Sequence, residues 1–180
     1  MFHNQQAFIA LGSNMSPERN LPQAVAMLQA RFPIVRVSSV WESAPVGYHE
    51  QPHFCNAAVL IDVAGCSPRR LKQECRRIEQ ALGRVRDPRN KNGPRTIDLD
   101  IALLGQTIIE EDDLHIPDPE IPDRPFLSVP LAELAPNFMH PQLHCSLKSI
   151  AERSQHSDLT LRSDINLAAA CQLPVRVPLN

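Results

Sequence analysis

Aromatic side chains are scarce in this sequence of 180 residues, of which Phe, Trp and Tyr together make up 4%. This scarcity argues against a surface on which nucleic-acid bases stack. The net charge of −2 provides no overall excess of basic residues for binding a nucleic acid or a membrane surface. We therefore expect neither of these partners.

Apolar runs long enough for a membrane span are also missing, because such a helix needs about 20 apolar residues in a row. The first ten residues contain neither a basic segment nor a long apolar one, so we expect no secretory signal. The cysteines are odd in number and lack CxxC spacing, which argues against a disulfide framework and a zinc site. We expect reduced thiols in a cytoplasmic protein at Cys55, Cys66, Cys75, Cys145 and Cys171.

The length fits a single domain, which we place at residues 1–155. Residues 156–180 lack clear periodicity, so we interpret them as a C-terminal extension that is loosely ordered. Prolines are numerous, 17 in all, and predict long loops with preset turns.

Hydrophobic patterns predict the order of the secondary structure. Serine followed by proline, at Ser16 and Ser67, predicts an N-cap and the first helical residue of each main helix. The order β-α-β-β-α-β predicts an α+β fold of the ferredoxin-like type, with an antiparallel sheet, helices on one face and long loops over the open face. We expect strands at 7–11, 34–43, 54–63 and 96–104, helices at 17–32 and 68–82, and short helices near 131–134 and 147–153.

Charge is divided along the chain. Residues 69–95 carry ten basic and three acidic side chains, whereas residues 98–123 carry nine acidic side chains and neither Lys nor Arg. This division predicts a basic surface that faces an acidic one across a cleft, as in a site for a polyphosphate and a metal. A solvated helix face followed by an acidic loop is the alternative interpretation.

The segment GPRTIDLD at residues 93–100 is the strongest chemical signal. On a strand, Asp98 and Asp100 share one face, because side chains alternate between faces. Two adjacent carboxylates repel each other unless a cation lies between them, and oxygen ligands suit Mg²⁺. The alternatives are a polar stripe that faces solvent and an acid paired with arginine. The preceding loop, residues 83–95, is basic and bounded by glycines, which favours a lid that closes on phosphates.

Ordered blocks of this sequence resemble the 6-hydroxymethyl-7,8-dihydropterin pyrophosphokinase family of folate biosynthesis. The resemblance covers about residues 7–141 and is most specific at GPRTIDLD. The blocks are ALGSN at 10–14, SAPVG at 43–47, QPHFCNA at 51–57, RIE at 77–79, GRVR at 83–86, GPRTIDLD at 93–100, RPF at 124–126, PL at 130–131 and HP at 140–141.

The resemblance implies that ATP donates its β,γ-pyrophosphoryl group to the hydroxymethyl oxygen of the dihydropterin and that AMP leaves. It implies ATP as co-substrate, two Mg²⁺ ions, and a protein that we expect to act as a monomer. By residue, it implies metal ligands at Asp98 and Asp100; catalysis by Arg84 and Arg95; ATP binding by Arg84, Arg86, Arg95, Ile101, His115 and Arg124; and pterin binding by Ser43, Ala44, Pro45, Val46, Phe54, Asn56 and Phe126.

One segment departs from the family. Asp118 stands where the family has a histidine that contacts ATP phosphates, and an aspartate would repel them unless it binds metal. His115 could substitute, but on an extended chain the two residues face different ways. A catalytically weakened pterin-binding or nucleotide-binding relative is therefore one alternative. The other is a ferredoxin-like RNA-binding module, although its aromatic signature is absent from the sequence.

Overall fold

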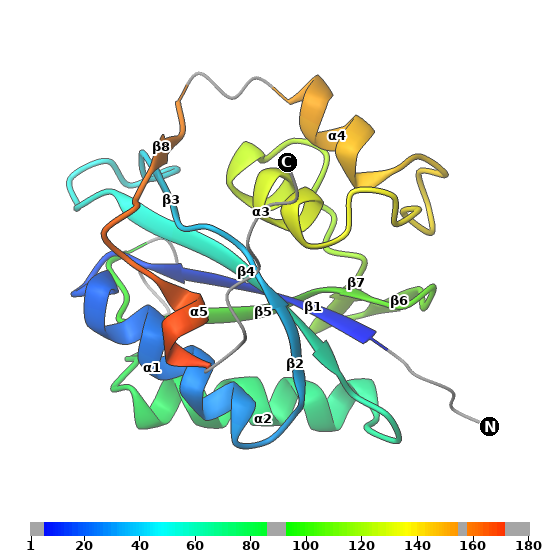
Figure 1. Ribbon diagram of the computed structural model, residues 1–180, viewed down its shortest axis with the longest axis horizontal. Coiled ribbons are helices and arrows are strands. Elements are labelled where there is room, and N and C mark those ends of the chain that lie inside the picture. Colours follow the sequence, from blue (N-terminus) through cyan, green and yellow to red (C-terminus); the bar gives the residue numbers. More distant parts are fainter. Residues whose placement is uncertain (1–5, 86–92, 155–157, 172–180) are drawn as a thin grey trace.

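The computed structural model describes residues 6–85, 93–154 and 158–171 (Figure 1). Its centre is an antiparallel sheet in which the strands follow the order β5-β1-β4-β3-β8, and β2 also pairs with β4. The β1–β4 pairing runs unbroken from Gln6–Asp62 to Ser13–Cys55, which makes these the two central strands. The strands are β1 (Gln6–Ser13), β2 (Ile34–Val37), β3 (Trp41–Ser43), β4 (Phe54–Asp62), β5 (Asp98–Leu104) and β8 (Thr160–Leu161).

Helices α1 (Pro17–Gln29) and α2 (Pro68–Ala81) cover one face of the sheet (Figure 1). Inward side chains of β1, β4 and β5 alternate along their strands and meet the apolar faces of these helices in one buried cluster. The cluster includes Ile9, Val59, Leu99, Leu21 and Ile78. The predicted ferredoxin-like arrangement is confirmed.

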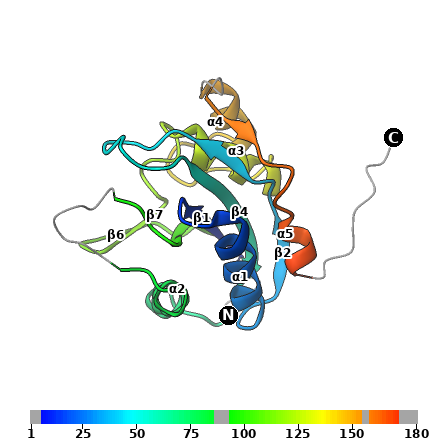
Figure 2. The ribbon, with the colours of Figure 1, turned by 90° about the vertical axis from the view of Figure 1, so that its left-hand side faces the viewer.

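The opposite face is less open than the sequence predicts. Helices α3 (Pro125–Leu134) and α4 (Leu147–Arg153) lie on the other side of the sheet from α2, as Figures 1 and 2 show. They bury a second apolar cluster that includes Phe8, Leu60 and Leu103. Loops and the functional cleft therefore share this face with a second helical layer. Within the described ranges, every helix is too short or too polar to cross a lipid bilayer.

The predicted strand at 34–43 divides into β2 and β3. Between them, Ser38 replaces regular strand pairing, because its hydroxyl accepts a hydrogen bond from the Ala58 N–H at 2.8 Å and its own N–H donates to the Ala58 carbonyl at 2.9 Å. A hairpin of β6 (Ile109–Glu111) and β7 (Leu114–Ile116), which the sequence pattern does not predict, follows β5.

The C-terminal extension also differs from the expectation of loose order. Within it, β8 pairs with β3, and helix α5 (Leu167–Ala170) packs against α1. Ile165, Leu167 and Cys171 are buried in the cluster beneath α1. These few apolar side chains are too widely spaced to produce a periodic signal, yet they suffice to attach residues 158–171 to the domain.

The two predicted serine caps behave differently. Ser67 is extended, and its hydroxyl accepts a hydrogen bond from the backbone N–H of Arg70 at 3.3 Å, as an N-cap should. Ser16 has a left-handed backbone with φ of 48°, and its side chain makes no cap hydrogen bond. The cap interpretation of the Ser16 side chain is therefore wrong, because this backbone conformation does not aim the hydroxyl at the first helical turn.

Replacing Ser67 by alanine should lower the free energy of unfolding by about 1 kcal/mol, the usual cost of removing a serine cap. Ser16→Gly is the matched control and should leave stability unchanged or raise it slightly, because glycine adopts a left-handed backbone without steric cost. Urea unfolding curves measure both. Equal losses at the two positions would contradict the difference between the caps.

Candidate functional site

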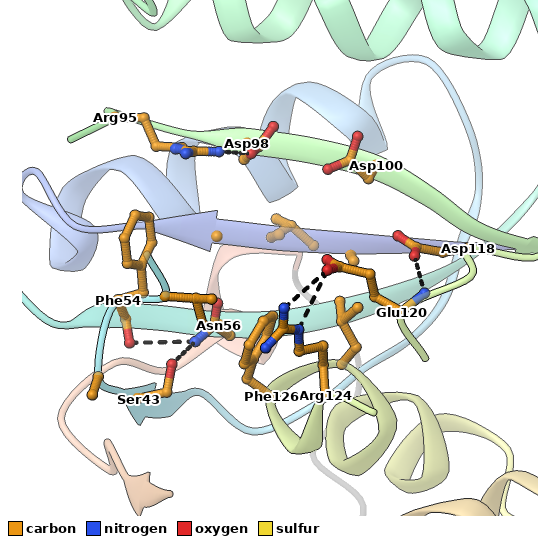
Figure 3. A pocket seen from close by; sticks show the side chains of 16 residues that line it. Ser43, Phe54, Asn56, Arg95, Asp98, Asp100, Asp118, Glu120, Arg124 and Phe126 are labelled. Carbon is orange, nitrogen blue, oxygen red and sulfur yellow. Dashed lines mark hydrogen bonds and ion pairs between the residues drawn. The ribbon is translucent and has the colours of Figure 1, made fainter. Parts of the chain in front are cut away.

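A cleft of about 260 Å³ opens on the face of the sheet that carries α3 (Figure 3). Strands β1, β4 and β5 form its floor, the loop after β3 forms one wall, and the segment leading into α3 forms the other. Its lining residues are Ala10, Leu11, Gly12, Ser43, Ala44, Val46, Phe54, Asn56, Arg95, Asp98, Asp100, Asp118, Glu120, Arg124, Phe126 and Leu127.

The two aspartates of β5 both line the cleft, as the alternation of the strand predicts (Figure 3). Leu99 and Ile101, between and after them, are buried in the cluster beneath the helices. The apolar residues hold the strand in register, so that both carboxylates are presented from a rigid element. This placement suits a site that binds a cation or an anion–cation pair.

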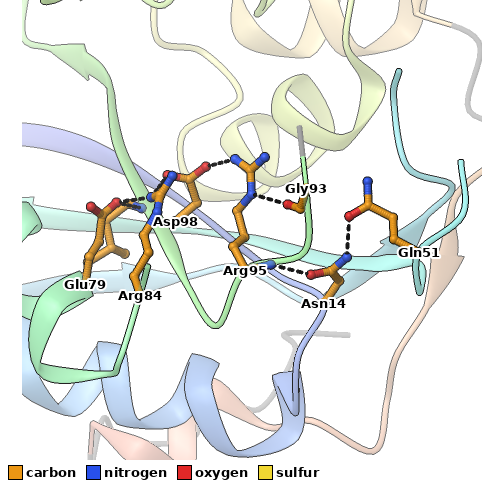
Figure 4. A network of polar contacts seen from close by, with 8 residues as sticks. Asn14, Gln51, Glu79, Arg84, Gly93, Arg95 and Asp98 are labelled. Atoms are coloured by element: carbon orange, nitrogen blue, oxygen red, sulfur yellow. Dashed lines mark hydrogen bonds and ion pairs between the residues drawn. The ribbon is translucent and has the colours of Figure 1, made fainter. Parts of the chain in front are cut away.

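Asp98 is held by two arginines. Arg84 and Arg95 each donate a hydrogen bond through Nη1, to Oδ1 and Oδ2 of Asp98 respectively (Figure 4). Burial opposes ionisation of Asp98, but the two guanidinium groups, Arg84 more than Arg95, outweigh it and keep the pKa of this carboxyl below its ordinary value. Asp98 is therefore charged, and both cations that compensate it come from the basic segment of the sequence.

Glu79 extends this network into the core. Its carboxylate is only 2% exposed, and its Oε1 accepts hydrogen bonds from Arg84 and, at 2.9 Å, from the backbone N–H of Leu99. The side chain of Arg84 is 10% exposed and does not line the cleft. It contacts Asp98, which does line the cleft. The contact joins the end of α2 to β5.

Asn14 fixes the loop that carries Arg95. Its Oδ1 accepts a hydrogen bond from the Arg95 N–H at 2.8 Å, and its Nδ2 donates to Gln51 Oε1 at 2.9 Å and to the Pro52 carbonyl at 3.1 Å (Figure 4). One amide thus ties together the segments on either side of the cleft mouth. The Arg95 guanidinium also lies 5.5 Å from the centre of the Phe54 ring, within the range of a cation–π contact.

The charged side chains near Asp100 are mostly acidic. In the described part of the chain, no side chain forms a hydrogen bond or an ion pair with its carboxylate. The protein that surrounds it within the cleft, followed by the charges of Asp98, Glu79 and Asp118, raises the pKa of Asp100 to about 7. A cation at this place would relieve the repulsion, so the donor set fits a divalent metal.

Asn56 and Ser43 form the polar end of the cleft. The Nδ2 of Asn56 donates to Ser43 Oγ at 3.0 Å and to the Phe54 carbonyl at 3.3 Å (Figure 3). Gly12 lines the floor of the cleft and has no side chain. A β-carbon added to it would lie 3.4 Å from Oδ1 of Asn56, so this oxygen is next to the floor of the cleft. The amide is therefore held by its donor side, and its acceptor oxygen is directed to the cleft.

A second cavity of about 240 Å³ adjoins the first along the outer edge of β5. Asp100 and Asp118 line both cavities. Ile101 and His115, which the sequence analysis assigns to ATP, line the second one. Its complete lining is Lys72, Cys75, Arg76, Leu99, Asp100, Ile101, Asp113, Leu114, His115, Asp118 and Pro119.

Asp118 and His115 lie on the same cavity because the chain bends at Pro117 instead of remaining extended. The Asp118 N–H donates to the Ala102 carbonyl at 2.8 Å, which places the residue against the end of β5, and Asp118 Oδ1 accepts from the Glu120 N–H at 2.8 Å. The expectation that the two residues face different ways is wrong. Partial burial raises the pKa of Asp118, and the Glu120 N–H opposes this.

Some side chains of the basic and acidic segments form ion pairs with each other within the fold. Asp113, on the hairpin, is paired with three basic side chains of α2, and Glu111 is paired with one of them. The basic partners are Arg69, Lys72 and Arg76. These pairs hold the hairpin against α2 and close one side of the second cavity, so part of the basic segment is paired with acidic side chains of the hairpin.

The other predicted residues fall into three groups. Of the pterin set, Pro45 is buried and does not line the cleft, whereas the other six residues line it. Of the ATP set, Arg95 and Arg124 line the cleft, and Arg124 donates to Glu120 Oε1 at 3.2 Å. Arg86 lies outside the described residues, as does most of the proposed lid. Sequence reasoning gave no role to Asn14 or Glu79, although both stand in the quoted blocks ALGSN and RIE.

Replacing Asp100 by asparagine should stabilise the metal-free protein at pH 8 and leave it unchanged near pH 4. With its pKa raised, folded Asp100 keeps its proton while the unfolded chain loses it, so wild-type stability falls as the pH rises from about 4 to 7. Because the carboxylate is open to the cleft, we expect a gain of only about 1 kcal/mol, or roughly 2–4 °C in Tm. Thermal unfolding in chelator at both pH values measures it, and an equal effect at both would contradict the assignment.

The chain is similar to a known family and to several known proteins. The family described as 7,8-dihydro-6-hydroxymethylpterin-pyrophosphokinase (HPPK) matches residues 8–136. The 2-amino-4-hydroxy-6-hydroxymethyldihydropteridine pyrophosphokinase of Bacillus subtilis is 44% identical over 134 residues, which cover 73% of this chain and 78% of that protein. The protein of the same name from Haemophilus influenzae is 35% identical over 158 residues, 86% of this chain and 97% of that protein.

Longer proteins contain a similar segment. The folic acid synthesis protein FOL1 of Dictyostelium discoideum is 38% identical over 142 residues, which cover 78% of this chain but 21% of that protein. The crystal structure of wild-type Plasmodium falciparum HPPK-DHPS has a TM-score of 0.66 at 13% identity and covers 83% of this chain and 44% of that chain. This chain therefore spans about a fifth of the first protein and less than half of the second.

The family match covers both cavities and the strands beneath them, and the bacterial relatives are similar over most of their own length. The resemblance noted in the sequence is thus confirmed: this chain belongs to the 7,8-dihydro-6-hydroxymethylpterin-pyrophosphokinase family.

Proposed function

We propose that this chain transfers the β,γ-pyrophosphoryl group of ATP to the hydroxymethyl oxygen of 6-hydroxymethyl-7,8-dihydropterin and releases AMP. The new bond joins that oxygen to the β-phosphorus, and the bond between the β-phosphorus and the oxygen of the α-phosphate breaks. One observation carries the proposal: Asp100 belongs to the walls of two adjoining cavities, with Asp98 beside it on the same strand face. Two substrates would meet there.

The first cavity suits a flat, polar ring. Phe54 and Phe126 line it from different elements, and stacking on aromatic rings is an effective way to hold a planar heterocycle. The acceptor oxygen of Asn56 is directed to this space, and it can receive a hydrogen bond from a ring N–H or amino group. We assign the pterin to this cavity, with Ser43, Ala44 and Val46 completing the wall and the buried Pro45 as part of the same segment.

The second cavity suits the nucleotide. Lys72, Arg76 and His115 supply positive or hydrogen-bonding groups, and Ile101 supplies an apolar surface. Arg124, on the wall of the first cavity, and Arg86, outside the described residues, complete the set that we assign to ATP. The triphosphate would then extend toward Asp98 and Asp100.

Asp98 and Asp100 would hold Mg²⁺, for which we propose two ions. Among the described residues, no group of three or more His, Cys, Asp or Glu side chains is placed to enclose a metal, and Mg²⁺ commonly takes its other ligands from phosphates and water. When bound, Mg²⁺ neutralises the triphosphate and orients it for displacement.

Arg84 and Arg95 would change partners when the triphosphate arrives. Both now donate to Asp98. Guanidinium groups bind phosphate oxygens strongly, often through two hydrogen bonds, so phosphate can replace the carboxylate as their acceptor. The protein thereby keeps its catalytic cations neutralised and oriented before substrate binds.

We also propose that the protein acts in the cytoplasm as a monomer, without a nucleic-acid or membrane partner. The cysteines support the first part, because Cys55, Cys66, Cys75 and Cys145 are thiols outside any disulfide.

AMP release from ATP tests the function directly. Wild-type protein should release AMP only when 6-hydroxymethyl-7,8-dihydropterin is present. Asn56→Ala should raise the KM for the pterin about tenfold, since an unpaired buried ring edge costs about 1–3 kcal/mol, while the KM for ATP changes little.

The matched control is Asn20→Ala, another buried amide, whose Nδ2 donates to the Met15 carbonyl outside the cleft. It should lower stability without a selective effect on pterin. Absence of AMP release by the wild type would sink the proposed function. An equal rise in both KM values for Asn56→Ala would instead reassign Asn56 to a structural role.

Asp118→His should increase the affinity for ATP. The residue lines the nucleotide cavity next to Asp100, where a negative charge repels phosphates and a histidine could donate to them. We expect a gain of about 1.5–3 kcal/mol at most, reduced by screening from Mg²⁺ and solvent. Calorimetry with ATP and Mg²⁺ measures it, and His115→Ala is the companion variant. If only His115→Ala changes the affinity, His115 makes the phosphate contact; if neither does, ATP does not occupy this cavity.

A further inference from the structure

The segment after residue 157 runs beside β3, the strand that carries Ser43 (Figure 1). Leu161 and Thr160 pair with Trp41 and Glu42 of β3, and the N–H of Arg162 donates to the Val40 carbonyl at 2.9 Å. Without this neighbour, β3 would be a short strand paired on one side only. We refer to residues 158–171 as the strap.

The side chain of Arg162 reaches across the back of β3 to β4. Its Nη1 donates to Glu42 Oε2 at 2.8 Å and to Cys55 Sγ at 3.3 Å. Its Nε and Nη2 donate to the two carboxylate oxygens of Asp164, at 2.9 and 2.8 Å, which fixes the plane of the guanidinium. Burial raises the pKa of Cys55 to about 11, so the sulfur that Arg162 contacts is a neutral thiol.

These contacts lie directly behind the pterin side of the cleft. In the β3–β4 register, Glu42 is opposite Cys55, Ser43 is opposite Phe54, and Trp41 is opposite Asn56. Because side chains alternate, Glu42 and Cys55 project to the back while Ser43, Phe54 and Asn56 face the cleft. Arg162 therefore links β3 to β4 on the face of the sheet opposite the cleft.

The C-terminal end of the strap is anchored in the core, which restrains the segment that carries Arg162. Ile165, Leu167 and Cys171 are buried in the cluster beneath α1. Gln29 Nε2 of α1 donates to the Cys171 carbonyl at 2.6 Å. The segment that carries Arg162 is thus attached to the domain through a buried apolar site.

The front of β3 has its own restraint. Glu133 of α3 accepts hydrogen bonds from Trp41 Nε1 at 2.6 Å and from the Ser39 N–H at 2.7 Å. The strand is consequently held between α3 on the cleft side and Arg162 on the reverse side. Such a two-sided restraint fixes the distance between Ser43 and Asn56, whose hydrogen bond is 3.0 Å.

We propose that Arg162 is a positioning residue for pterin binding and that the strap orders the pterin side of the cleft without touching the ligand. The inference rests on the proposed function, because it assigns the pterin to the cavity of Phe54 and Asn56. Preorganisation of this kind improves affinity by removing the cost of ordering the site on binding.

The test compares Arg162→Met with Arg153→Met in the full-length chain. Arg153 is a matched control, because its Nη2 also donates to a cysteine sulfur, Cys145 Sγ at 3.1 Å. It lies at the end of α4, which does not pair with β3. Arg162→Met should raise the KM for the pterin about tenfold, as expected for the loss of charge-assisted hydrogen bonds that hold a site, with little change in kcat or in the KM for ATP. Arg162→Lys should restore part of the loss.

Glu42→Gln provides a second variant if Arg162→Met is too unstable to assay, because it keeps the β3–β8 pairing and should raise the pterin KM in the same direction. Hydrogen exchange should also show faster amide exchange at 41–43 and 54–56 in Arg162→Met but not in Arg153→Met. An unchanged pterin KM, or a parallel rise in the KM for ATP, would overturn the positioning role while wild-type AMP release still upholds the function. A wild type that releases no AMP would overturn the proposed function itself.

Discussion

Compensation of the buried carboxylate of Glu79 determines how the cleft is built. A carboxylate so deeply buried is stable only with hydrogen-bond donors around it. Its donors are the backbone N–H of Leu99 and the guanidinium of Arg84. Because one belongs to β5 and the other follows α2, this single group fixes the helix relative to the strand and places a cation beside Asp98. The position of the strand that carries Asp98 and Asp100 therefore depends on a residue that lines neither cavity.

The same network compensates part of the negative charge of the site. Arg84 and Arg95 neutralise Asp98, and Asp100 avoids the remaining repulsion by holding its proton more strongly. The two aspartates of this strand thus differ: Asp98 is paired with two arginines, whereas burial and neighbouring acidic groups raise the pKa of Asp100. The two aspartates are similar in sequence and differ in what surrounds them.

Local patterns predicted the central sheet and the carboxylate face well. The alternation in TIDLDI contains both the core face and the cleft face of β5, and the proline-led helices begin at Pro17 and Pro68 as expected. Those patterns could not reveal contacts between distant segments. The division at Ser38 depends on its hydrogen bonds with Ala58, and the order of the strap depends on the burial of its apolar side chains in the cluster that contains the inner face of α1. The position of Arg84 behind Asp98 depends on Glu79, so a list of arginines could not separate a cleft-lining residue from a supporting one.

Under the assignment proposed above, with the pterin in the first cavity and the nucleotide in the second, the shared wall has a consequence for ligands that join a pterin-like ring to a nucleoside. Such a molecule would gain from effective concentration, because its second half binds without a further loss of free translation. Its connecting chain, however, must pass Asp100 and Asp118, which line both spaces. A phosphate linker would bring negative charge to this crossing and would bind only together with cations, whereas a neutral or positively charged linker could cross without them. The geometry of one wall thus decides whether bivalent recognition depends on the metal concentration.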